Sequence, residues 1–155
     1  MCHIPTKEIK TAKEKGLKVY KVVRVQKEED YTPLINDIKG RSFIYKPISV
    51  LKYYSPFTNS EIAIGVTMRD TLHQYSCWKE KELGPGFYHF FKTKKDATAF
   101  LKHIRKETGN INFCILVGNV PYGEPYNEGM FIFNDIVFGS IVSRSVYYNG
   151  KTYYE

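Results

Sequence analysis

The spacing of apolar and polar positions predicts one amphipathic helix in the second half of the chain. Thr93, with Asp96 three positions on, forms an approximate capping box, and Gly109 follows the last turn. The pattern predicts a helix over Lys94 to Glu107 that packs its apolar stripe on a sheet. Four residues at i, i+3, i+4 and i+7 form this stripe: Ala97, Phe100, Leu101 and Ile104.

Short runs of β-branched and aromatic residues predict strands. The run from Ile111 to Val120 is strongly apolar, as expected of a central strand covered on both faces. Gly84-Pro85-Gly86 is a turn signal that precedes an aromatic strand. The remaining predicted strands are Leu17 to Gln26, Phe87 to Phe91, Met130 to Phe133, Val137 to Ser143 and Val146 to Tyr148.

The start and the middle of the chain have weaker patterns. A short surface helix is predicted from Thr6 to Lys15, with Thr6 as its N-cap and Gly16 ending it. Between Lys27 and Lys81 we expect loops, short strands and one helical turn. Prolines interrupt this region at Pro33, Pro47 and Pro56, between short extended pieces at Ser42 to Tyr45 and Glu61 to Thr67.

The order of these elements predicts an α+β fold. Helix, strand, irregular middle, strand, helix and several strands follow one another without regular βαβ alternation or an internal repeat. A chain of 155 residues fits a single domain over residues 1–155. We expect a mixed or antiparallel sheet packed by one clear amphipathic helix and a short N-terminal helix.

Several features of the sequence predict a cytoplasmic protein. Its longest apolar stretches fall well short of the ~20 residues of a spanning helix. The N-terminus runs into a lysine-rich stretch without the apolar region of a secretory signal. Three cysteines without a close pair indicate neither a disulfide framework nor a metal clip, and a reducing compartment fits them.

Charge and tyrosine content favour an anionic partner. Subtracting 16 acidic from 23 basic side chains gives a net charge of +7. Thirteen tyrosines exceed the needs of a core, so several are expected to line a surface or pocket. There they could stack bases beside cations, or form a protein interface. Direct nucleic-acid binding stays open from charge alone, although no helix-turn-helix, zinc finger or RNP-type motif is present.

No motif for a metal or cofactor is visible, and none is predicted. The four histidines lack the spacing of zinc ligands, and no phosphate loop or dinucleotide fingerprint occurs. Cys114 lies in an apolar run, which predicts a core thiol with a raised pKa. Cys2 and Cys77 have more polar neighbours but no assignable base, so no role follows for them.

The segment from Pro121 to Gly129 is predicted to be a loop after a buried strand, a common position for binding residues. It contains Tyr122, Glu124, Tyr126 and Glu128. One of its carboxylates could orient a ribose hydroxyl or act as a general base. The alternative, that both are solvated loop charges, has the greater weight.

Three segments in order resemble small phage and prophage proteins of largely unassigned function: Lys18 to Arg24, Gly86 to Ala97 and Val120 to Gly123. The same ordering is similar to the core of ADP-ribosyltransferase-like domains, in which a basic residue, a tyrosine-containing strand and a late glutamate surround NAD. That resemblance implies Arg24, Tyr88, and Glu124 or Glu128 as the matching positions. The family's hydroxyl-bearing motif has no secure counterpart here.

The leading hypothesis is a phage-type binding protein that captures an anionic, nucleotide-derived ligand without catalysis, and so acts against host defence. Its predicted ligand-binding residues are Arg24, Tyr88, His89, Tyr122, Glu124, Tyr126 and Glu128. One alternative is an ADP-ribosyltransferase-like enzyme that uses NAD. Another is an inhibitor that docks on a host defence protein through its aromatic and basic face. Self-association into a homo-oligomer stays open.

Overall fold

The structure, a computed structural model, describes residues 2–36, 43–57, 59–69, 88–110 and 112–155. In these residues ten strands form one sheet, and every pairing between strands is antiparallel. The strands are β1 (Cys2–Thr11), β2 (Leu17–Asn36), β3 (Phe43–Tyr54), β4 (Glu61–Ile62), β5 (Thr67–Arg69), β6 (Tyr88–Phe91), β7 (Phe113–Val120), β8 (Pro125–Phe133), β9 (Ile136–Ser143) and β10 (Ser145–Tyr153).

The predicted α+β class is wrong, because the described residues are mostly antiparallel β, with ten strands and one helix. The main error lies at the N-terminus, where the predicted helix from Thr6 to Lys15 is instead strand β1, paired with β8. A helix there has too thin an apolar face to pack, whereas the edge of β8 supplies backbone partners. Tertiary pairing thus overrides local propensity. Gly16 is left-handed as predicted, with φ +70°, but it lies in the turn between β1 and β2.

The helix of the second half is confirmed as α2 (Lys94–Thr108). Thr93 caps it by accepting a hydrogen bond from the Asp96 N–H, and Gly109 ends it in a left-handed conformation. Its four predicted apolar residues are all buried. In the described residues, no helix has the length and apolar character required to cross a membrane.

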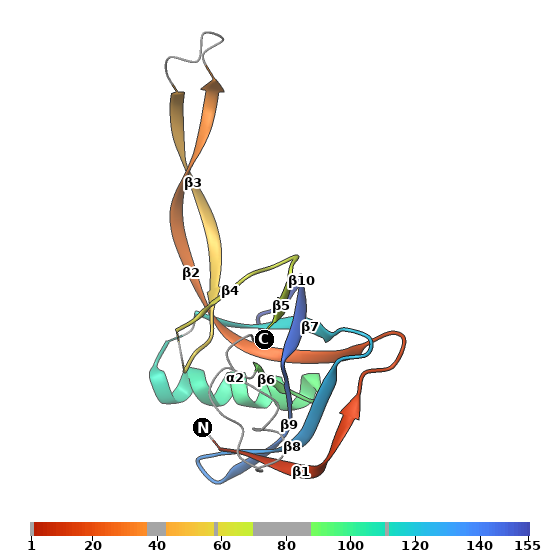
Figure 1. Cartoon of the computed structure of the whole chain (residues 1–155). Helices are drawn as coiled ribbons and strands as arrows, with labels where there is room; N and C mark the ends of the chain where they lie inside the picture. Colours follow the sequence, from red (N-terminus) through yellow and green to blue (C-terminus); the bar gives the residue numbers. More distant parts are fainter. Residues whose placement is uncertain (1, 37–42, 58, 70–87, 111) are drawn as a thin grey trace.

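The middle of the chain is more regular than predicted. Strand β2 continues ten residues past the predicted end at Gln26 and pairs with β3 along its whole outer part. Figure 1 shows that this β2–β3 ribbon projects away from the rest of the protein as a long arm. The short predicted strands correspond to parts of β3, β4 and β5. The Gly84-Pro85-Gly86 turn and Cys77 lie outside the described residues.

The later predicted strands are confirmed: β8, β9 and β10 extend beyond their predicted bounds, whereas β7 begins at Phe113, two residues after the predicted start. Strand β7 is buried along almost its whole length, as expected of a central strand. The predicted loop from Pro121 to Gly129 is wrong in its second half, because β8 begins at Pro125. Only Pro121 to Glu124 form a turn, with Gly123 left-handed. Strand β8 pairs on both sides, with β1 and β9, and this pairing draws Tyr126 and Glu128 into the sheet.

The sheet bends strongly round on itself. Its strand order is β1-β8-β9-β6-β2-β7-β10-β5, so three strands separate β9 from β10. Yet only Arg144 links the end of β9 to the start of β10 in the chain. The sheet must therefore curl until these two strands meet at a corner.

Two cores result from this bend. The helix-side core lies between the sheet and α2 and is rich in phenylalanine: Val22, Phe91, Ala97, Phe100, Leu101, Ile104, Phe113, Ile115, Phe131 and Phe138. The inner core lies on the opposite, enclosed face: Ala12, Val19, Val23, Ile62, Phe90, Cys114, Leu116, Val120, Ile141, Val146 and Tyr148. The predicted core role of Cys114 is confirmed, and burial raises the pKa of its thiol to about 12.

Candidate functional site

A cavity of about 170 Å³ lies where strands β2 and β6 separate. Among the described residues these strands pair only at Tyr20 and Phe91, so the described residues that follow face each other without a backbone ladder. The cavity is lined mainly by apolar and aromatic side chains from both cores: Lys21, Val22, Ser55, Pro56, Phe57, Ser60, Glu61, Ile62, Met68, Tyr88, His89, Phe90, Phe91, Phe100, Phe131, Ser140 and Tyr148.

Lys21 brings a positive charge into this apolar space. Strand alternation places it on the inner face of β2, between the fully buried Val19 and Val23. Its Nζ donates a hydrogen bond to the His89 carbonyl oxygen over 2.9 Å and lies 5.7 Å from the centre of the Phe90 ring. Burial lowers the pKa of this amine from 10.5 to about 8. The ammonium bridges the two separating strands and retains further N–H groups for another acceptor.

Tyr148 supplies a second polar group to the lining of the cavity. This residue of β10 is 1% exposed, and in the described part of the chain its hydroxyl has no hydrogen-bond partner. Burial raises the pKa of the phenol well above its usual 10, so the group is a neutral donor at physiological pH. A buried hydroxyl without a partner costs about 1–3 kcal/mol. Such a cost points to a missing acceptor in the cavity.

The segment from Ser55 to Ile62 covers one side of the cavity. The Ser55 N–H bonds the Ser60 carbonyl, and the Asn59 N–H bonds the Ser55 carbonyl, so the segment closes into a tight turn. Phe57 packs its ring 6.2 Å from Phe100 and 6.5 Å from Phe131. The turn thus closes the cavity with an aromatic side chain that is itself partly exposed.

Three of the predicted ligand-binding residues lie at or beside the cavity. Tyr88 and His89 line it directly. Arg24 lies outside, at the base of the arm, where it stacks 4.8 Å from the Tyr54 ring and donates to the Gln26 and Asn59 side chains. Through Asn59 it contacts the turn that covers the cavity, so Arg24 affects the cavity only indirectly.

Tyr126 is the next nearest of these residues. Ser143 of β9 pairs with Tyr88 on one side and with Tyr126 on the other, so the two tyrosines lie in one row across three strands. Both pack against the inner core, but Tyr126 does not line the cavity. Tyr122 lies apart on the turn before β8 and is 69% exposed.

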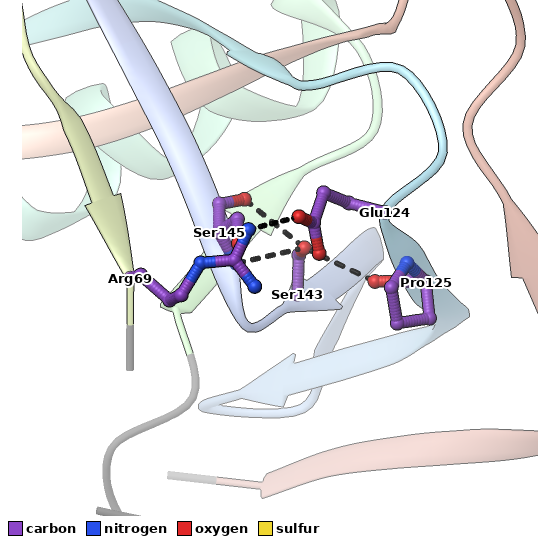
Figure 2. Close-up of polar contacts among 5 residues, drawn as sticks. All are labelled: Arg69, Glu124, Pro125, Ser143 and Ser145. Atoms are coloured by element: carbon purple, nitrogen blue, oxygen red, sulfur yellow. Dashed lines mark hydrogen bonds and ion pairs between the residues drawn. The ribbon is translucent and has the colours of Figure 1, made fainter. Parts of the chain in front are cut away.

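Glu124 belongs to a polar cluster at the corner between β9 and β10, which Figure 2 shows. Its carboxylate pairs with the Arg69 guanidinium from β5. Beside it the buried Ser143 hydroxyl accepts from the Ser145 N–H and shares its proton between the Pro125 and Ser145 carbonyls. These contacts hold the corner of the sheet in place. They also keep the Glu124 carboxylate in an ion pair with Arg69.

The Glu128 carboxylate also forms ion pairs, with two lysines. Its two carboxylate oxygens lie 2.8 Å from the Lys10 Nζ and 3.6 Å from the Lys92 Nζ. The hydrogen bond from Lys10 is the main reason that the pKa of Glu128 is lowered. Neither Glu124 nor Glu128 lines the cavity, so the positions matched to Arg24, Tyr88 and a late glutamate do not converge on one point.

The two residues that give the cavity its polar character were missed by the sequence analysis. A signal for Lys21 existed, since a lysine with valine at both i−2 and i+2 in a predicted strand shares their buried face. No local signal marked Tyr148, because its burial depends on the curl that brings β10 over β2. In the described residues, no group of three histidine, cysteine, aspartate or glutamate side chains is placed to hold a metal ion.

Comparison with known proteins gives no match at a significant level to any protein-family model, curated protein or solved structure.

Proposed function

We propose that this protein is a small binding protein that captures a nucleotide-derived anion without catalysis, with the ring of the ligand in the cavity between β2 and β6. The observation that carries the proposal is that one mostly apolar cavity is lined both by Lys21, whose ammonium keeps N–H groups for a further acceptor, and by Tyr148, whose hydroxyl has no partner among the described residues. Binding sites commonly combine such an apolar wall with a few placed polar groups.

The size and lining of the cavity favour a single ring system. Pockets for drug-sized ligands are typically ~300–1,000 Å³, and this cavity measures about 170 Å³. Phe90, Phe91 and Tyr88 offer aromatic surface to a flat ring, while Lys21 and Tyr148 offer protons to a carbonyl oxygen or ring nitrogen. The ribose and phosphate of a nucleotide would extend outward from the base, and Ser55 and Ser60 are polar lining residues that they could contact.

The charge balance favours an acceptor or anion at Lys21. In the described residues, no ion pair includes Lys21, and the rim carboxylate Glu61 lies 4.0 Å from Lys52. A hydrogen bond from an ammonium in a low-dielectric cavity is stronger than one in water. Binding without catalysis is favoured because the carboxylates of Glu124 and Glu128 are held by cations away from the cavity. Sequestration of a nucleotide signal would be the corresponding anti-defence action.

The test is ligand binding by wild type and two cavity variants. Native mass spectrometry of gently purified protein is expected to show a retained nucleotide-sized mass. In isothermal titration with adenosine and uridine monophosphates, Lys21→Met and Tyr148→Phe should each weaken binding about tenfold or more. The matched control is Lys27→Met, an exposed lysine of the same strand, which should bind as wild type does. Equal binding by all four proteins would refute the assignment of the site.

A second function, docking on a host protein, is favoured by the β2–β3 arm. Ile48 is 38% exposed and Leu51 49% exposed on this ribbon. A two-stranded ribbon is marginally stable alone in water, and a partner surface would cover these side chains. A specific protein should co-purify with wild type and be lost from Ile48→Ser/Leu51→Ser, but not from the control Ile136→Ser/Val137→Ser. Loss from neither variant, or from both, would count against docking through the arm.

A further inference from the structure

A second polar site lies on the other side of the sheet, where the start of α2 meets β2 and β10. Lys94 Nζ lies 3.6 Å from the centre of the Tyr153 ring, and Lys151 Nζ lies 5.4 Å from it. Lys18 Nζ lies 5.8 Å from the neighbouring Tyr20 ring. We call these five residues the lysine–tyrosine cluster. None of them lines the cavity.

The cluster holds a positive charge that the described residues do not neutralise. None of the ion pairs among them includes Lys18, Lys94 or Lys151. All three lysines act on one phenol: the pKa of Tyr153 is lowered first by a hydrogen bond from Lys151, and then by the charges of Lys151, Lys94 and Lys18. Like charges gathered around one group repel each other, and an anion would relieve that repulsion.

The position of Lys94 strengthens this argument. It occupies the first turn of α2, followed by Lys95. A helix N-terminus carries a partial positive charge and disfavours cations. The acidic residue of the turn, Asp96, directs its carboxylate to the Gly139 N–H instead. Cation–π contact with Tyr153 contributes only about 0.5–1 kcal/mol at an exposed position, so it offsets little of this unfavourable placement.

We propose that the lysine–tyrosine cluster binds the phosphates of a single-stranded nucleic acid. Three unneutralised ammonium groups match the repeated charges of a phosphodiester backbone. Tyr20 and Tyr153 add two aromatic rings beside those cations, the combination with which proteins hold single strands without reading sequence. A duplex fits less well, since Tyr20 and Tyr153 lie partly buried in the sheet, whereas a duplex groove is read by an element that enters it.

The test is fluorescence anisotropy with a short labelled oligothymidine over a range of salt concentrations. Lys18→Ala/Lys94→Ala/Lys151→Ala removes three phosphate contacts. This should reduce the magnitude of the negative slope of log K against log salt by about 2, and the affinity at 0.1 M salt by about 100-fold. The matched control, Lys13→Ala/Lys102→Ala/Lys106→Ala, removes the same charge from exposed positions elsewhere. It should keep the wild-type slope.

Three results would overturn the proposal. The two triple variants could lose affinity equally, in which case net charge alone attracts the strand. The slope of the cluster variant could equal that of wild type. Inorganic phosphate could displace the oligonucleotide at equal concentration, which would assign the cluster to a free phosphate. Circular dichroism of each variant confirms that it is folded before titration. None of these results bears on Lys21 or Tyr148.

Discussion

Replacing Tyr148 by phenylalanine removes one oxygen from the cavity wall and leaves the ring in place. The ring packs 6.2 Å from Phe90 in the inner core, so its apolar contacts are retained. The lost hydroxyl is buried and has no partner among the described residues. Without ligand, the substitution should therefore raise the free energy of unfolding by about 1–3 kcal/mol.

Urea denaturation measures this change. With m-values of about 1–3 kcal/mol/M, the midpoint should rise by about 1 M with an unchanged slope. Tyr54→Phe is the matched control, because the Tyr54 hydroxyl donates to Glu28 Oε1 over 2.6 Å. The loss of this hydrogen bond should lower stability.

A bound ligand should reverse the order of stability of wild type and Tyr148→Phe. A saturating ligand that accepts a hydrogen bond from the hydroxyl stabilises wild type more than Tyr148→Phe. A variant that is no more stable than wild type without ligand would refute the reasoning. It would mean that the hydroxyl already has a partner, such as a bound water, and that the cavity wall lacks the free donor on which the proposed function rests.

Three further predictions concern titration and capping. The pKa of Lys21 is lowered to about 8 in the folded protein, so above that pH the unfolded chain binds more protons than the folded one. The stability of wild type should therefore rise from pH 8 to 10 relative to that of Lys21→Met. Parallel curves of stability against pH for the two proteins would contradict this. Thr93→Ala removes the bond from the Asp96 N–H and should cost about 1 kcal/mol in thermal unfolding, whereas no change would show that the cap is dispensable. The pKa of Glu128 is lowered in the folded protein, so the ionised carboxylate stabilises the fold above the ordinary pKa of 4.5, and this contribution is lost as pH falls through the folded pKa. Glu128→Gln should therefore flatten the acid side of a curve of stability against pH. An unchanged acid side would show that the ion pair with Lys10 contributes nothing.

The sequence predicts best the structural features that depend on residues close together in the chain. Helix α2 has its cap, apolar stripe and terminal glycine within one stretch of chain, and all were found. The sequence does not predict the β2–β3 arm, because Pro33 and Pro47 are typical of interruptions between short strands. In a two-stranded ribbon each strand has a free edge, where a proline that lacks an N–H costs little.

The candidate site was only half predicted for a related reason. Tyr88 and His89 lie next to each other on an aromatic strand, and both were chosen for their chemistry. Lys21 and Tyr148 matter because a curled sheet brings β2 and β10 round one cavity, and that curl depends on pairings between distant segments. The local composition around Tyr126 and Glu128 predicts a loop, whereas pairing of β8 with two neighbouring strands makes both residues part of the sheet.

The order of the strands also decides when this protein can fold. Cys2 of β1 pairs with Ile132, and Leu17 of β2 pairs with Val120. A chain leaving the ribosome therefore exposes its first two strands long before their partners are made. Only the β2–β3 ribbon closes early, since its strands are near neighbours. Contacts of such wide sequence separation make folding slow, and the unpaired edges in the meantime can aggregate. This protein is thus expected to depend on chaperones during synthesis more than a helical protein of its length.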